Sequence, residues 1–182
     1  MKKRTKFLAA LLSAAMAVSS LVGISAFASE AGEEETRTVV DATGAEVEVP
    51  AHPEKIAISV MVLPNMVYAL QGSADNIVSI PPAAYSGWEM SMLKYLAPEL
   101  EDVDTTMVSD DGSANVEALA EAGVDLVLSF DSQTDMAEQL KALGIPCVLL
   151  SSAKNMDDLE NLITMLGDAL NCEDRAQQVI SW

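Results

Sequence analysis

The chain has 182 residues, of which half are hydrophobic and 21% are charged. Acidic residues outnumber basic ones by 28 to 10, and the formal net charge at pH 7 is −18. A surface of this sign disfavours nucleic-acid binding, because contacts to a phosphate backbone need Lys and Arg side chains. The excess charge either keeps the protein soluble or attracts a basic partner surface, and the composition is compatible with both.

Residues 1–28 are typical of a secretory signal peptide. Four basic residues between positions 2 and 6 precede an apolar run from Phe7 to Val22, and Ala26-Phe27-Ala28 has the small-x-small pattern of a cleavage site. The run is short for a membrane span. We therefore expect cleavage before Ser29 and export to the periplasm or the outer face of a bacterial cell. Ile24 stands where a lipoprotein would carry its Cys, so we expect no lipid anchor.

Strands and helices alternate through the remaining chain. Residues 29–36 form an acidic lead that we expect to be flexible. Alternating apolar and polar residues at 38–41 and 46–49 predict a β-hairpin. The further predicted elements are buried strands at 55–59, 76–80, 124–130 and 146–150, an edge strand at 107–108, a loop at 83–87, helices at 64–70, 88–96 and 116–122, a helix containing Met136, Leu140 and Leu143, a helix capped by Asn155, and a helix starting at Glu173.

This alternation predicts an α/β fold, with a mostly parallel sheet, helices on both faces and a β-hairpin in front. Ligands of such sheets bind beyond the carboxyl ends of the strands. The residues at or just after those ends are therefore the candidate ligand-binding residues: Ser59, Met61, Tyr85, Trp88, Ser129, Asp131 and Ser151.

Each candidate also has a structural interpretation. Tyr85 and Trp88 either stack on a planar ligand or pack the next helix onto the sheet. The three serines either bind a ligand or cap strand ends. Asp131 either faces the cleft or caps a helix, and Met61 either lines the cleft or fills the core.

Residues for catalysis or for a metal site are scarce. His52 is the one His in the chain, so neither a nucleophile–base pair nor a His-rich metal site can be assembled around it. No Gly-rich phosphate loop follows a strand. The Asp110-Asp111 pair is interpreted as stabilising the start of a nearby helix. We expect a protein that is not an enzyme and holds no cofactor.

Four motifs occur in the order of one known family, and the resemblance covers about residues 36–182. They resemble the family's opening hairpin, its first strand, its Asn-x-Glu helix followed by a buried strand, and its Leu-Gly-Ile-Pro strand. The segments are Val40 to Pro50, His52 to Ala57, Asn115 to Val127, and Leu143 to Val148. The chain thus resembles the amino-terminal lobe of a class III ABC-transporter substrate-binding protein, a family that serves importers of iron–siderophores, haem and cobalamin.

The resemblance implies an extracytoplasmic component of an ABC importer that carries a small-molecule metal complex or macrocycle. It implies an ABC permease as the protein partner, with the membrane surface met only through that permease. Glu117 would be the carboxylate that docks on basic permease residues. Alternatively, Glu117 only stabilises the start of its own helix.

The resemblance also sets the expected domain boundaries. Residues 37–172 would form the amino-terminal ligand-binding lobe, and residues 173–182 would begin a truncated helix that links the two lobes of a family member. Half of the expected cleft would then lie outside this chain. A different class of function is also compatible with a single lobe, namely a protein-interaction module or a non-functional remnant.

Overall fold

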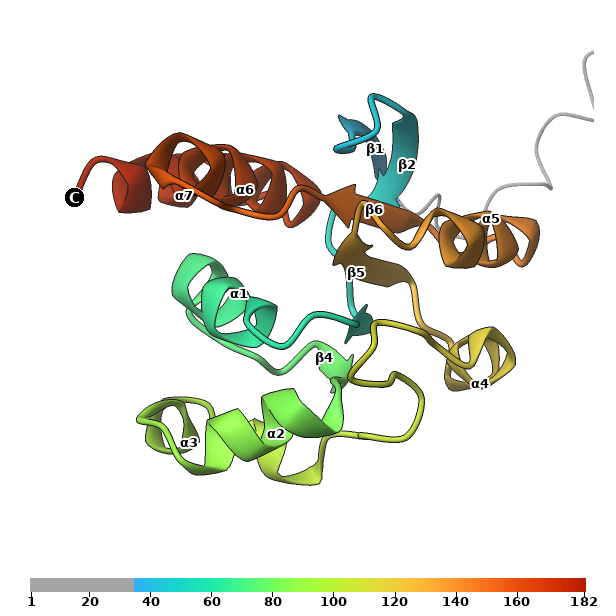
Figure 1. Cartoon of the computed structure of the whole chain (residues 1–182), viewed down its shortest axis with the longest axis horizontal. Helices are drawn as coiled ribbons and strands as arrows, with labels where there is room; N and C mark the ends of the chain where they lie inside the picture. The colour runs from blue at the N-terminus through green and yellow to red at the C-terminus, as the bar shows by residue number, and fades with distance from the viewer. Residues whose placement is uncertain (1–34) are drawn as a thin grey trace, which may run out of the picture. The chain divides into compact units, whose positions relative to one another are not determined.

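Four parallel strands form the central sheet in the computed structural model, which describes residues 35–182 (Figure 1). Their order is β4-β3-β5-β6, and a separate antiparallel pair, β1 and β2, precedes them in the chain. The strands are β1 (Thr36–Val40), β2 (Glu46–Pro50), β3 (Ile56–Ile58), β4 (Ile77–Ser79), β5 (Leu126–Phe130) and β6 (Cys147–Leu150). The helices are α1 (Leu63–Gln71), α2 (Pro82–Glu89), α3 (Leu93–Leu96), the 3-10 helix η1 (Pro98–Asp102), α4 (Val116–Ala122), α5 (Thr134–Ala142), α6 (Met156–Ala169) and α7 (Glu173–Ile180).

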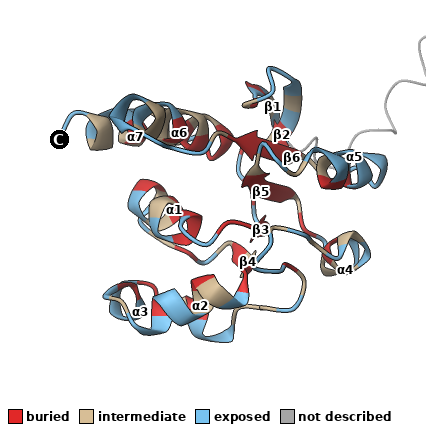
Figure 2. Cartoon of the chain, in the orientation of Figure 1, coloured by how far each residue is buried: buried red, intermediate tan, exposed pale blue. Residues whose placement is uncertain are grey.

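Helices cover both faces of the sheet, which confirms the predicted fold class (Figure 1). Successive strand residues point to opposite faces. Leu126 and Leu128 of β5 therefore pack in one core with α1, α6 and α7, whereas Val127 packs in a second core with α4 and α5. Most residues of β3, β4, β5 and β6 are buried (Figure 2), as expected for a parallel sheet with helices on each face.

The predicted hairpin is present, and its turn is held by Asp41. The Asp41 carboxylate accepts hydrogen bonds from the backbone N–H groups of Thr43 and Ala45 at 2.8 and 3.0 Å. The backbone N–H of Ala42 donates to the carbonyl oxygen of Leu149 in β6 at 2.7 Å. The turn is thereby attached to the outer edge of the sheet.

Several predicted boundaries are corrected. Thr36 belongs to β1, so the strand begins inside the segment expected to be a flexible lead. The expected signal peptide and residues 29–34 lie outside the described residues. Val108 forms only an isolated bridge with Ala114 and no edge strand of the sheet. Leu143 follows the end of α5 and is 50% exposed, so it is not part of that helix's buried face.

The predicted loop at 83–87 is helical. These residues lie in α2, which ends at Glu89, and the chain leaves the helix before α3 begins at Leu93. Pro82 occupies the first turn of α2, where its missing N–H costs no helical hydrogen bond and its fixed φ favours helix formation.

The capped helices agree with the predictions. Asn115 accepts a hydrogen bond from the Ala118 N–H at 3.1 Å, and Gly123 ends α4 in the left-handed conformation. Asn155 accepts one from the Asp158 N–H at 2.9 Å at the start of α6. Among residues 35–182, no helix combines the length and apolar composition needed to cross a bilayer.

Helices α6 and α7 approach closely at Gly167. A Cβ atom added to Gly167 would lie 2.6 Å from the Cβ of Ala176, which is shorter than any normal non-bonded carbon–carbon contact.

The Arg37 side chain pairs with Glu173, which ties β1 to the first turn of α7. The hydrogen bond from Arg37 is the main cause of a lowered pKa at Glu173.

We predict that Gly167→Ala lowers the free energy of unfolding by about 1–3 kcal/mol, the range for overpacked sites. Gly87→Ala is the matched control, because it lies in α2 and its new Cβ would meet nothing within 4 Å. In a helix this control gains roughly 0.5–1 kcal/mol, since Ala loses less backbone entropy than Gly. Urea denaturation of both variants measures the difference. Equal effects would contradict the close approach of α6 and α7.

Candidate functional site

The chain adds strands to both sides of β3, so the direction in which the sheet grows reverses between β3 and β5. From β3 the chain passes through α1 to β4 on one side, and it later returns to place β5 on the other side of β3. The helices that follow these two central strands, α1 and α5, consequently pack on opposite faces of the sheet. A crevice is expected where the chain diverges in this way, beyond the carboxyl ends of the two strands.

A hollow of about 320 Å³ lies at this position. It is formed by the ends of β3 and β5 together with a loop that precedes α4. The residues that line it are Ser59, Val60, Met61, Val62, Asp110, Asp111, Gly112, Ser129, Phe130, Ser132 and Gln133. We call it the switch-point hollow.

Two buried serines connect the strands at the base of the hollow. Ser59 and Ser129 are 4% and 0% exposed, and the Ser59 hydroxyl donates to the Ser129 Oγ at 2.7 Å. A serine hydroxyl carries one hydrogen and two acceptor positions. Ser129 accepts this bond and is fully buried, so the pair joins β3 to β5 at the base of the hollow.

The loop that supplies the two carboxylates is held rigidly against the sheet. Asp110 accepts a hydrogen bond from the Ala83 N–H at 2.8 Å, which connects the loop to the start of α2. Gln133 donates to the carbonyl oxygen of Asp111 at 3.1 Å. Gly112 follows the two aspartates with φ +82°, a left-handed backbone conformation that favours glycine.

The hollow is acidic and rich in hydrogen-bond acceptors. The Ser113 side chain and backbone both donate to Asp111, and these bonds lower the pKa of that carboxyl group. Both Asp110 and Asp111 are exposed. No Lys or Arg of the described chain lines this hollow. The site can therefore accept hydrogen bonds from a ligand and attract positive charge.

Three of the residues predicted from the sequence meet at this hollow. Ser59, Ser129 and Met61 line it, and Met61 is 55% exposed. Asp131 and Ser151 do not line it. The Asp131 N–H continues the ladder by donating to Leu150 at 3.0 Å, and the Ser151 hydroxyl lies 4.0 Å from the sulfur of Met165.

Trp88 and Tyr85 lie away from the predicted cleft edge. Trp88 is 3% exposed, and its indole N–H donates to the carbonyl oxygen of Ala97 at 2.9 Å. The Tyr85 ring packs on Trp88 with centroids 5.2 Å apart, and its hydroxyl donates to the backbone carbonyl oxygen of Glu101 at 3.2 Å. Both rings thus fasten α2 to the segment that follows it, which is the structural interpretation, and burial leaves Trp88 no open face for a ligand.

Asp110 and Asp111 were missed as site residues, because their sequence position suggested only a role near a helix start. Nothing in the sequence relates this loop to Ser59, which lies about fifty residues earlier. A weak signal was available in the Asp-Asp-Gly turn, whose Gly permits the tight loop.

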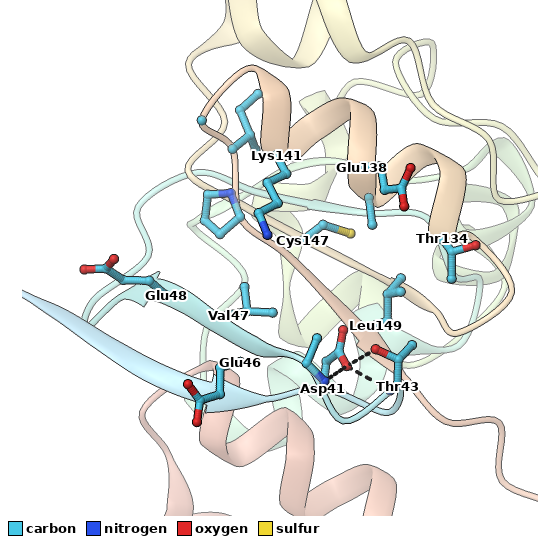
Figure 3. A pocket seen from close by; sticks show the side chains of 15 residues that line it. Asp41, Thr43, Glu46, Val47, Glu48, Thr134, Glu138, Lys141, Cys147 and Leu149 are labelled. Atoms are coloured by element: carbon cyan, nitrogen blue, oxygen red, sulfur yellow. Dashed lines mark hydrogen bonds between the residues drawn. The ribbon is translucent and has the colours of Figure 1, made fainter.

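A second hollow, of about 430 Å³, lies at the β6 edge of the sheet (Figure 3). The β1–β2 hairpin, α5 and β6 surround it, and among the residues that line it are Asp41, Val47, Lys141, Cys147 and Leu149. Although it is larger, it does not lie beyond the carboxyl ends of β3 and β5. We therefore take the switch-point hollow as the candidate ligand site.

Glu117 lies in the first turn of α4 with its side chain exposed. Within residues 35–182 its carboxylate makes neither an ion pair nor a side-chain hydrogen bond. The cap of this helix is supplied by Asn115 instead. The Glu117 carboxylate is thus accessible to a partner.

Comparison with known proteins identifies the family. The sequence profile of the periplasmic binding protein family matches residues 65–181. A probable siderophore-binding lipoprotein of Bacillus subtilis, YfiY, is 30% identical over 187 residues, which cover 100% of this chain and 53% of the relative. An uncharacterized ABC transporter substrate-binding lipoprotein of the same organism, YvrC, is 26% identical and is covered over 55% of its length, against 99% of this chain.

A solved structure extends the comparison to three dimensions. The periplasmic solute-binding protein from Veillonella parvula superposes with a TM-score of 0.76 at 35% identity, over 81% of this chain and 44% of that one. The chain belongs to the periplasmic binding protein family, and the resemblance to a class III substrate-binding protein of ABC transporters is confirmed. It spans about half the length of the curated relatives that it matches.

The serine pair provides a test of the site's geometry. We predict that Ser129→Ala lowers the free energy of unfolding by about 1–3 kcal/mol, because it leaves the buried Ser59 hydroxyl without its acceptor. Adding Ser59→Ala removes both partners, so the double variant should cost less than the sum of the two single changes. Urea denaturation of the four proteins measures this coupling. Strict additivity would contradict the 2.7 Å contact.

Proposed function

We propose that the protein is the extracytoplasmic substrate-binding component of an ABC importer, with an iron–siderophore, haem or corrinoid as its ligand. The observation that carries this proposal is the switch-point hollow at the ends of β3 and β5 in a chain of the periplasmic binding protein family. The name of the relative YfiY describes a probable siderophore-binding protein, which supports this ligand class. The proposed role is binding and delivery, without catalysis.

The proposal treats the chain as the first lobe of a two-lobed protein. Residues 37–172 would form this lobe and residues 173–182 would begin the helix that links it to the second. Coverage of about half of each curated relative supports this arrangement. The ligand would then be enclosed between the switch-point hollow and a second lobe of similar size, as in the clefts between domains where small ligands commonly bind.

Export and the permease partner belong to the same proposal. Both curated relatives are described as substrate-binding or siderophore-binding lipoproteins, which supports a location outside the cytoplasm. Residues 21–24 of this chain read Leu-Val-Gly-Ile, without the Cys of a lipid attachment site, and they lie outside the described residues. We propose export guided by the signal peptide and contact with the membrane only through the permease.

The lining of the switch-point hollow narrows the ligand chemistry. Asp110, Asp111 and the Ser59–Ser129 pair offer acceptors, whereas no described cation lines the hollow. Met61 and Val62 add exposed apolar surface beside them. A neutral or cationic ligand with an apolar face, such as a corrinoid or an uncharged ferric complex, fits this lobe better than one that presents carboxylates to it.

Ligand binding is tested with a two-lobed protein that contains this lobe, titrated calorimetrically with cyanocobalamin, an uncharged ferric hydroxamate, haem and ferric citrate. We predict binding of at least one of the first three and weaker binding of ferric citrate. Asp110→Asn/Asp111→Asn keeps the turn acceptors and removes two negative charges. This double variant should raise the affinity for ferric citrate, relative to that for the uncharged ferric hydroxamate, by about tenfold, or ~1.4 kcal/mol.

The matched control is Glu54→Gln/Asp75→Asn, which removes two exposed charges near the amino ends of β3 and β4. It should leave the relative affinities unchanged. If none of the four ligands binds, the proposed ligand class is wrong. If both double variants change the ligand preference equally, net charge and not the switch-point hollow determines it.

Docking is tested at Glu117. We predict that Glu117→Ala leaves ligand binding unchanged and weakens binding to the permease reconstituted in lipid nanodiscs, because it removes an exposed charge that would pair with basic permease residues. Glu121→Ala is the control on the same helix. A helix-start role alone would instead lower stability by about 0.3–1 kcal/mol and leave permease binding intact.

A further inference from the structure

The outer edge of β6 carries unpaired backbone groups. β6 is the last strand of the sheet and pairs only with β5 among the described residues. The carbonyl oxygen of Pro146 accepts a hydrogen bond from the Val127 N–H of β5 at 2.9 Å, and that of Leu150 accepts one from the Asp131 N–H just after β5 at 3.0 Å. In a parallel ladder alternate residues bond to opposite sides. The N–H and C=O groups of Cys147 and Leu149 therefore point away from β5.

One of these outward groups has a partner and the others do not. The Leu149 carbonyl oxygen accepts the Ala42 N–H at 2.7 Å, from the turn of the β1–β2 hairpin. Within residues 35–182, no backbone group outside the sheet meets the Cys147 N–H, the Cys147 C=O or the Leu149 N–H. Both residues are nevertheless buried, at 6% and 3% exposure. Unpaired backbone groups in buried positions are costly and rare, so these groups bond either to water or to a further strand.

The two residues that carry these groups line the second hollow, of about 430 Å³ (Figure 3). Val47 of β2 and Cys147 and Leu149 of β6 form an apolar floor, and Lys141 extends from α5 toward the middle of the hollow. Burial raises the pKa of the Cys147 thiol to about 12, so the thiol stays neutral. The hollow combines a strand edge with an apolar floor.

The surface around the hollow is acidic. Glu46, Glu48 and Glu138 are exposed lining residues, against the single cation Lys141. Along this edge the Cys147 N–H is a donor, the Cys147 C=O is an acceptor and the Leu149 N–H is a second donor. This alternation matches the backbone groups of another extended strand. A second copy of this chain is disfavoured, because residues 29–182 contain 28 acidic and six basic residues and two copies would repel each other.

We propose that this β6-edge hollow binds an extended peptide segment of a partner protein, with apolar side chains on the floor and basic side chains toward the surrounding glutamates. The segment adds a strand to the sheet next to β6. Its backbone pairs with Cys147 and Leu149, and Lys141 donates to one of its carbonyl oxygens. This surface is separate from the switch-point hollow, so the proposal is independent of the ligand proposed above.

The test uses fluorescence anisotropy of the purified chain with a labelled, end-blocked peptide, Lys-Val-Lys-Val-Lys. We expect saturable binding that is at least tenfold tighter than that of Glu-Val-Glu-Val-Glu. Methylation of alternate backbone nitrogens in the same basic peptide should lower its affinity at least tenfold. The methylated peptide keeps its charge but can no longer donate hydrogen bonds along one edge. Equal binding of the methylated peptide would overturn strand addition and leave only charge attraction.

Protein variants locate the site. Glu138→Lys reverses one exposed charge beside the hollow and should lower the affinity for the basic peptide about fivefold. Glu160→Lys makes the same charge change on α6 and should leave that affinity unchanged. Equal loss in both variants would overturn the location. Absence of saturable peptide binding would overturn the proposal. It would also be overturned if sedimentation showed a concentration-dependent dimer whose stability Glu138→Lys changes, because the β6 edge would then bind a second copy of the chain.

Discussion

The parallel pairing of β3 with β5 is the constraint on which the rest of this structure depends. β3 is only three residues long, yet Ile56, Ala57 and Ile58 are completely buried and pair on one side with β4 and on the other with β5. Because the chain leaves β3 in one direction and returns on its other side, α1 and α5 must pack on opposite faces. The loops that follow the two strands diverge as a result and leave the switch-point hollow between them.

The chemistry of that hollow follows from which loops converge on it. The Ser59–Ser129 hydrogen bond joins the two central strands, and Gln133 holds the Asp111 loop against the end of β5. Polar groups positioned in this way by hydrogen bonds are preorganised, so binding a ligand requires little further ordering of the protein. The lobe thus offers acceptors and negative charge, and a complementary ligand supplies donors or positive charge.

The hairpin has a different structural role, at the outer edge of the sheet. An exposed edge strand is a site for unwanted pairing, and proteins commonly cover or interrupt it. Here the Ala42–Leu149 hydrogen bond fastens the hairpin turn to β6 and blocks one end of that edge. The Arg37–Glu173 ion pair ties the other part of the hairpin to α7. Within residues 35–182, the outward backbone groups of Cys147 have no hydrogen-bond partner beside the second hollow.

The sequence by itself determined the fold class and those elements whose signals are local. Asn115 and Asn155 cap their helices, Gly123 ends one, and the apolar run at 124–130 contains a buried strand. Strand order and loop convergence depend on contacts between distant residues, which periodicity does not encode. Only the tertiary structure therefore brought Asp110 and Asp111 beside Ser59, buried Trp88 against Ala97, and left the Cys147 backbone without a partner among residues 35–182.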